Sequence, residues 1–121
     1  MTRFKSQGFY NTFRNARKGL RLVIKSEMNI RIHLVIAFLV LIFAFLLNFT
    51  AVEFCIALFA IAMVIVSEML NTAIEFTLDS IYHNKYSKMV GMAKDISAGA
   101  VMLASVVALV IGVLLFGKHL I

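Results

Sequence analysis

The sequence predicts an all-α integral membrane protein, with an amphipathic surface helix at the N-terminus followed by three transmembrane helices. Of its 121 residues, 62% are hydrophobic and 15% are charged, a balance too apolar for a soluble domain of this size. Proline is absent, and the apolar residues gather in three long runs that follow a basic N-terminal segment. The length suits one domain, residues 1–121.

Residues 1–28 are expected to form a helix that lies in the membrane interface. Its apolar face on a helical wheel carries Phe9, Phe13, Ala16, Leu20, Val23 and Ile24. Its basic side chains fill the neighbouring arc: Arg14, Arg17, Lys18, Arg21 and Lys25. This pattern is typical of a helix whose basic side faces lipid headgroups. A cleavable signal peptide is the alternative, but the basic region is too long and no small-x-small cleavage site follows the first apolar run.

Three further segments, 32–49, 51–82 and 93–116, are expected to be helices that contain the spans. The first has about 18 residues, enough to cross a hydrocarbon core of about 30 Å. The second has no helix breaker and would extend to about 48 Å, so its second half should emerge from the membrane. Glu53, near its outer end, is expected to be a solvated or snorkelling interface residue. A polar connection, residues 83–92, precedes the third segment.

Basic residues predict the orientation. The N-terminal segment and residues 83–95 together carry eleven of the 12 Lys and Arg residues, and the remaining one is Lys118. The positive-inside rule therefore places the N-terminus and this connection in the cytoplasm and the C-terminus outside. A net charge of +6 could also indicate nucleic-acid binding, but three apolar runs make an anionic membrane face the better partner.

The most informative stretch is Ser67–Asp79, which reads SEMLNTAIEFTLD. On one helix its polar side chains share an arc of about 80°: Glu68, Asn71, Thr72, Glu75 and Asp79. Three carboxylates on one stripe repel each other, and near a membrane they need a cation, a hydrogen-bond donor or a proton. Polar contacts between helices are the structural alternative, which stays open for Thr72 and Asp79. A working site is favoured for Glu68, Asn71 and Glu75.

Two further clusters are expected at the same membrane face. Asp95 could be a favourable charge at a helix N-terminus, and Lys94 could be an interface lysine. The short connection returns both residues to the acidic stripe, which puts a cation beside its carboxylates. Glu27 could pair with Arg31 or, together with Glu75, hold a divalent cation such as Mg²⁺, which prefers oxygen ligands.

Several common kinds of site are absent from the sequence. Cys55 is the single cysteine, so an intrachain disulfide and a multi-cysteine zinc site are excluded, and a small buried hydrophobe is its expected role. There is no GxxxxGK[ST] phosphate loop and no set of protein-kinase motifs. His33 is expected to be an interface residue rather than a ligand. If a nucleotide binds, side chains and a metal must hold its phosphates.

The acidic stretch resembles the signature of the prokaryotic diacylglycerol kinase family. The matching residues run from Glu68 to Glu75 and continue to Asp79. A second block of the family is similar to Ala93-Lys94-Asp95 and Ala98-Gly99-Ala100-Val101, and matches also occur at Lys18-Gly19-Leu20-Arg21 and Glu27. The likeness covers nearly the whole chain. Residues 27–34, EMNIRIHL, make it more similar to the undecaprenol kinase branch.

The resemblance implies a lipid kinase of the bacterial inner membrane, built as a homotrimer with active sites shared between subunits. Such an enzyme transfers the γ-phosphoryl group of MgATP to the hydroxyl of undecaprenol or diacylglycerol. By matching positions, the general base is Glu68. The metal ligands are Glu27 and Glu75. The residues that bind the substrate or the nucleotide are Asn71, Lys94, Asp95, Tyr86, Gly91, Arg14 and Arg17; either arginine is open as the one that meets ATP.

Two other classes stay open from the residues alone. A small oligomeric ion or metabolite transporter would use Glu68 and Glu75 near mid-membrane as a proton or cation relay. A non-catalytic membrane partner protein would explain the small residues that repeat every four positions in the third span, Ala100, Ala104, Ala108 and Gly112, but not the carboxylates. Glu68 lies about 25 Å along its helix from Ala51, close to headgroup depth, so a surface site is favoured.

Overall fold

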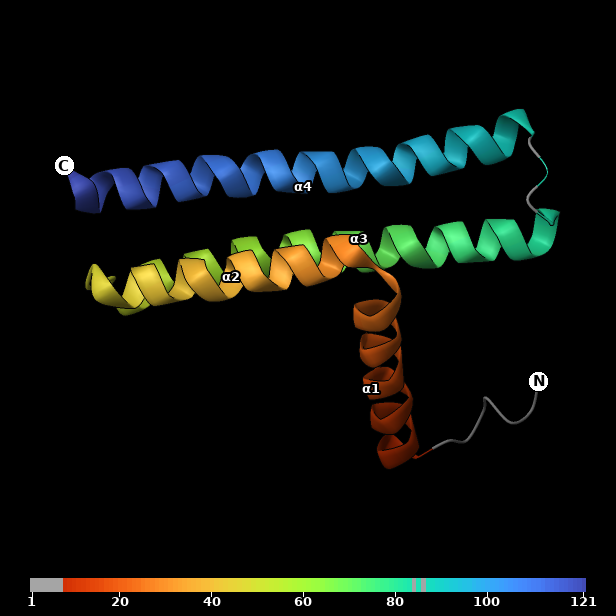
Figure 1. Ribbon diagram of the computed structural model, residues 1–121, viewed down its shortest axis with the longest axis horizontal. Coiled ribbons are helices and arrows are strands. Elements are labelled where there is room, and N and C mark those ends of the chain that lie inside the picture. Colours follow the sequence, from red (N-terminus) through yellow and green to blue (C-terminus); the bar gives the residue numbers. More distant parts are fainter. Residues whose placement is uncertain (1–7, 84, 86) are drawn as a thin grey trace.

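The computed structural model describes residues 8–83, 85 and 87–121, and in these residues the chain is all-helical. The helices are α1 (Phe9–Ser26), α2 (Met28–Leu46), α3 (Ala51–Tyr82) and α4 (Lys88–Leu120). The last three run side by side, whereas α1 projects sideways from the start of α2 (Figure 1). The predicted all-α class is confirmed for the described part of the chain.

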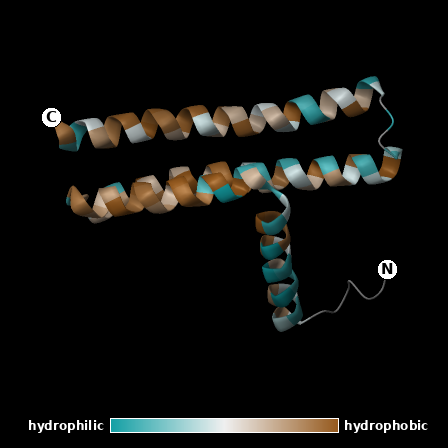
Figure 2. Cartoon of the chain, viewed as in Figure 1, coloured by the Kyte–Doolittle hydropathy of each residue, from teal (hydrophilic) through white to brown (hydrophobic). Residues whose placement is uncertain are grey.

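Helices α2, α3 and α4 are each long and apolar enough to cross a membrane. Their apolar residues gather at one end of the bundle, while polar residues mark α1 and the second half of α3 (Figure 2). Large side chains on the outside remain uncovered: Phe38, Phe59 and Leu103 are 65%, 68% and 66% exposed. Lipid or another subunit, rather than water, is the physical partner of such a surface. The prediction of three candidate spans is therefore confirmed.

Small residues bring the three long helices together. The most extensive packing is between α3 and α4, followed by that between α2 and α3. The buried positions on α2 include Ala37 and Ala44, and those on α3 include Ala57 and Ala60. Small side chains at helix contacts let backbones approach closely, which is how helices associate in lipid.

Side-chain caps begin the two longest helices. At α3 the hydroxyl of Thr50 accepts from the N–H of Glu53, and Glu53 Oε1 accepts from the N–H of Thr50, a reciprocal capping box. At α4 the hydroxyl of Ser87 accepts from the N–H of Val90 at 3.2 Å. This cap starts α4 at Lys88, so the second half of the polar connection expected at 83–92 is helical.

Glu53 is not the solvated interface residue that the sequence predicted. It is 6% exposed, and its carboxylate meets Lys118 Nζ at 3.0 Å and His119 Nε2 at 2.9 Å. The His119 ring also stacks on Phe49, with 4.6 Å between the ring centroids. The expectation was wrong because the end of α4 returns polar side chains to the start of α3, which distance along the chain does not reveal.

The first two helices meet at a corner. The helix expected over residues 1–28 is α1, which ends at Ser26, and residues 1–7 lie outside the described part. Helix α2 begins at Met28, before the expected start at residue 32, and ends at Leu46, where Asn48 makes a left-handed turn with φ 60°. Most apolar side chains of α1 remain uncovered, with Phe9 at 87% exposed, whereas Val23 near its end is buried. Its position on the membrane surface stays a prediction.

Candidate functional site

The predicted polar stripe lies on α3, and four of its five residues meet partners from other parts of the chain. Side chains of α2, α4 and the corner at Glu27 contribute these partners. The pairs are Glu68 with His33, Thr72 with Glu27, Asn71 with Ser97, and Asp79 with Lys94. Interhelical pairing therefore stabilises groups that would repel or lack partners on an isolated helix.

Glu68 is the member of the stripe whose hydrogen bonding is incomplete. Its side chain is 12% exposed, and Oε1 lies 3.6 Å from His33 Nε2. Its other oxygen, Oε2, is buried and has no hydrogen-bond partner among the described residues. A buried acceptor without a donor destabilises the fold, so this atom needs a donor that a water, an ion or a ligand can supply.

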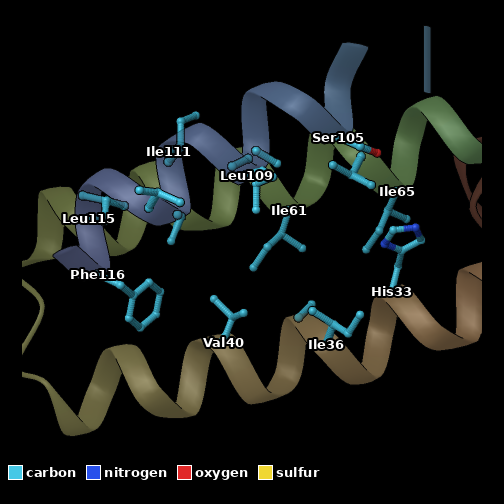
Figure 3. A pocket seen from close by; sticks show the side chains of 17 residues that line it. His33, Ile36, Val40, Ile61, Ile65, Ser105, Leu109, Ile111, Leu115 and Phe116 are labelled. Carbon is cyan, nitrogen blue, oxygen red and sulfur yellow. The ribbon is translucent and has the colours of Figure 1, made fainter. Parts of the chain in front are cut away.

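A cavity of about 520 Å³ lies between α2, α3 and α4, a volume typical of ligand pockets. His33, the neighbour of Glu68, stands at one end, and Phe116 stands at the other (Figure 3). Apart from His33 and Ser105, the side chains that line it are apolar. Ala108 and Gly112, from the small-residue repeat of α4, also line it. A hydrocarbon chain is the ligand that such a wall favours.

Asn71 is held by a residue that the sequence analysis did not single out. Ser97 Oγ lies 2.5 Å from Asn71 Oδ1 and 3.1 Å from the carbonyl oxygen of Lys94, and Ser97 is 7% exposed. A hydroxyl has one proton, so it donates to one of these acceptors at a time. The sequence signal for Ser97 was its position three residues after Lys94, which puts both residues on the same face of α4.

Lys94 reaches the acidic stripe, as the sequence indicated. Its Nζ atom is 2.7 Å from Asp79 Oδ1, and Glu75 adds a further negative charge to its surroundings. Asp95 follows it on α4 and is exposed. The structure therefore joins a cation from α4 with the Asp79 carboxylate of α3 at the polar end of the bundle.

Four further residues are implied for the nucleotide: Gly91, Arg14, Arg17 and Tyr86. Gly91 was expected in a loop, but it lies in the first turn of α4, where its N–H donates to the carbonyl of Ser87 at 2.9 Å. That difference follows from the Ser87 cap. Arg14 and Arg17 are exposed on α1, which points away from the bundle (Figure 1). Tyr86 lies outside the described residues.

The carboxylates proposed for a metal come from two elements. Glu27 stands in the corner between α1 and α2, and its Oε1 accepts from Thr72 Oγ1 at 3.2 Å. It does not pair with Arg31, which donates instead to carbonyls of α1. Glu75 lies one turn after Thr72. The described residues contain no group of three acidic, histidine or cysteine side chains able to hold a metal. Two carboxylates do fit Mg²⁺, which usually takes one or two together with substrate phosphates and waters.

Comparison with known proteins matches the sequence to one family. The family model for prokaryotic diacylglycerol kinase matches residues 14–116. The chain is 36% identical to an undecaprenol kinase of Bacillus subtilis over 89% of this chain and 87% of that protein. It is 33% identical to a diacylglycerol kinase of Synechocystis over 84% of this chain and 58% of that protein. It is 31% identical to the diacylglycerol kinase of Escherichia coli over 84% of this chain and 83% of that protein.

Three helices able to span a membrane and a polar stripe at one end of them, together with these relatives, define a small membrane-embedded lipid kinase. The chain belongs to the prokaryotic diacylglycerol kinase family.

Proposed function

We propose that the chain transfers the γ-phosphoryl group of ATP to the hydroxyl of a membrane lipid, with undecaprenol preferred over diacylglycerol. The observation that carries the proposal is the buried Glu68 Oε2 atom, which lacks a hydrogen-bond partner among the described residues. The other oxygen of this carboxylate, Oε1, lies 3.6 Å from Nε2 of His33, a residue that lines the apolar cavity. A lipid hydroxyl would donate to Oε2 while its hydrocarbon chain follows the cavity. The 36% identity to an undecaprenol kinase supports the preferred acceptor.

Glu68 is the general base of this reaction. The hydroxyl oxygen of the lipid attacks the γ-phosphorus, and the bond from that phosphorus to the oxygen bridging it to the β-phosphate breaks. The hydroxyl proton moves to Glu68, and ADP leaves. Phosphoryl transfer depends mainly on in-line positioning and charge neutralisation. Both are available at the stripe, where Asn71 is held by Ser97 and Lys94 brings a positive charge.

The nucleotide is proposed to bind at the polar end of α3 and the start of α4. Asn71, Lys94 and Asp95 would contact it directly. Further contacts would come from Tyr86, Gly91, Arg14 and Arg17. Glu27 and Glu75 would hold Mg²⁺, which supplies neutralisation of phosphate charge when it is bound. The support is the chemistry of the donor set: Glu27 is hydrogen-bonded to Thr72, Glu75 lies one turn after Thr72 on α3, and Lys94 brings a positive charge.

We also propose the membrane, the orientation and the assembly. The protein lies in the bacterial inner membrane, with its N-terminus and the polar stripe in the cytoplasm and its C-terminus outside, as the distribution of basic residues predicts. It forms a homotrimer. The uncovered apolar outer faces of the helices support self-association, since another subunit can cover them. Native mass spectrometry of the detergent-solubilised protein tests the subunit number.

Phosphate transfer from radiolabelled MgATP tests the function directly. The purified protein in mixed micelles would be offered undecaprenol and diacylglycerol side by side. We expect both to be labelled, with undecaprenol in clear excess. Diacylglycerol in excess would reverse the acceptor preference and keep the kinase.

Label in neither lipid, with the protein folded and Mg²⁺ supplied, would contradict the proposed activity. The transporter hypothesis would then be tested by measuring cation and proton flux in liposomes. The transporter needs Glu68 and Glu75 as a relay. Flux that is lost in Glu75→Gln would favour it.

A further inference from the structure

One hydrogen bond crosses from the corner between α1 and α2 to the stripe on α3. Thr72 Oγ1 donates to Glu27 Oε1 at 3.2 Å, between residues 45 positions apart. Thr72 is 7% exposed, so packing holds its hydroxyl in place and little water competes for it. One oxygen of the Glu27 carboxylate therefore has a protein donor, and the other keeps its lone pairs for a further partner.

Glu27 needs such a contact because it stands at a break in the helical backbone. Its φ and ψ angles of −117° and 113° are extended, so no helical neighbours fix its side chain. Arg31 spans the break: its Nη1 atom donates to the carbonyls of Ile24 and Lys25 at 2.9 and 2.8 Å. Arg31 thus holds the main chain of the corner, and the direction of the carboxylate is left to Thr72.

We propose that Thr72 is a positioning residue whose hydroxyl orients the Glu27 carboxylate toward the divalent cation of the nucleotide; the proposal rests on the lipid kinase function given above. Thr72 lies one turn after Glu68 and one turn before Glu75 on the same face of α3. It therefore stands between the general base and the second metal ligand. Groups that hydrogen-bond a metal ligand fix its orientation, and their loss typically lowers metal affinity by about 10–100-fold.

If Thr72 only packs against its neighbours, the variants rank differently in metal affinity. Valine is similar to threonine in shape but has no hydroxyl, whereas serine keeps the hydroxyl and loses the methyl group. If Thr72 orients Glu27, Thr72→Ser keeps metal affinity and Thr72→Val loses it. If Thr72 only packs, Thr72→Val is harmless and Thr72→Ser is the more damaging change.

The chain offers a matched control on the same helix. Thr77 Oγ1 donates to the carbonyl of Ala73 at 2.7 Å on the exposed side of α3. Thr77→Val therefore removes a hydroxyl from α3 without removing any contact to Glu27. A second comparison is Glu27→Gln, which replaces a negatively charged ligand by a neutral amide of similar size.

Binding of Mn²⁺, used in place of Mg²⁺, tests the proposal in the full-length protein in detergent micelles. Electron paramagnetic resonance would follow the titration in the presence of a non-hydrolysable ATP analogue. We expect Thr72→Val to weaken Mn²⁺ binding by about 10–100-fold, with Thr72→Ser and Thr77→Val unchanged. Thr72→Val should also raise the Mg²⁺ concentration required for half-maximal turnover, while the rate at saturating Mg²⁺ stays close to that of the wild type.

Unchanged Mn²⁺ affinity in folded Thr72→Val overturns the proposal, and so does equal weakening in Thr72→Ser and Thr72→Val. If Thr72→Val does not fold, Thr72→Ala replaces it in the same comparison with Thr72→Ser. Glu27→Gln separates the two possible failures. If that variant binds Mn²⁺ as tightly as the wild type, the proposed metal site is wrong. If it loses Mn²⁺ while Thr72→Val does not, only the role of Thr72 is rejected.

Discussion

Single residues of the stripe differ in how completely they are bonded. Asp79 and Asn71 each meet a side chain of α4, at 2.7 Å from Lys94 and 2.5 Å from Ser97. Glu68 meets His33 only at 3.6 Å, and its second oxygen is buried without a donor among the described residues. A buried acceptor is normally satisfied in a folded protein, and this unmet oxygen is the basis for proposing Glu68 as the general base.

Glu68→Gln tests the general base. We expect turnover to fall by about 10²–10⁴-fold, because an amide does not take up the hydroxyl proton. The two side chains are similar in size, so folding and nucleotide binding should be retained. The measurements are phosphate transfer in mixed micelles, thermal unfolding and calorimetric titration with an ATP analogue. Full activity in the folded variant would falsify the assigned role.

Ser97→Ala tests the support of Asn71. A hydrogen bond of this kind contributes about 0.5–1.5 kcal/mol, so kcat/KM should fall by about 2–10-fold. The loss should be expressed mainly in KM, because Ser97 acts through Asn71 rather than on the reacting atoms. Ser80→Ala, at an exposed position of α3, is the control and should match the wild type. Equal kinetics in both variants would mean that Asn71 does not need the contact.

Helix α3 extends from an end of the bundle where contacts between helices stabilise the fold to the end that carries the polar stripe. Its first residues form the capping box at Thr50 and are tied to the end of α4 through Glu53. Its second half carries the stripe. Glu53 and Glu68 are fifteen residues apart, about 22 Å along the helix, so changes at one end should leave the other nearly undisturbed.

Glu53→Gln separates these two ends experimentally. Loss of the carboxylate removes the charge that Lys118 and His119 meet, so we expect the Tm to fall by a few degrees. The rate of phosphate transfer at a low, permissive temperature should stay near that of the wild type. Lys118→Gln should have a smaller effect on Tm, because the Lys118 side chain is 71% exposed and exposed ion pairs contribute little. A Tm equal to that of the wild type in Glu53→Gln would contradict this account.

In the whole molecule, apolar and polar halves are separated along the bundle (Figure 2). The apolar half encloses the cavity of about 520 Å³, and the polar half carries the residues proposed for the nucleotide. His33 and Glu68 stand where the halves meet (Figure 3 shows His33 at that end). In the proposed function, this division lets one site meet a hydrocarbon chain from the membrane and a charged donor from water.

Gly112→Leu tests whether the lipid chain occupies the cavity. Gly112 lines the cavity, and a Cβ atom added there would have nothing within 4 Å, so a leucine has room to fill the space. We expect the KM for undecaprenol to rise several-fold while the KM for ATP is unchanged. Gly117→Leu is the matched control, because its Cβ is equally unhindered but Gly117 does not line the cavity. If both variants match the wild type, the chain lies elsewhere.

Composition and local sequence patterns were enough to predict the class of the protein and most of the proposed site. Three apolar runs predicted three candidate spans, which the structure confirms, and the stretch from Glu68 to Glu75 indicated the family that the comparisons confirm. These features depend on composition, helical period and local motifs, which are properties of neighbouring residues. Two local signals for the helix starts went unused. These were the TxxE pattern that begins at Thr50, and Ser87 three residues before Val90.

The contacts between residues far apart in the sequence became visible in the folded chain alone. The burial of Glu53 against His119, the bond from Ser97 to Asn71 and the bond from Thr72 to Glu27 join residues 66, 26 and 45 positions apart. The cavity likewise exists only because three helices pack at particular positions along their lengths. The homotrimer and the surface position of α1 stay predictions. The physical reason is that helical period places a side chain on a face, whereas its partner depends on how whole helices pack together.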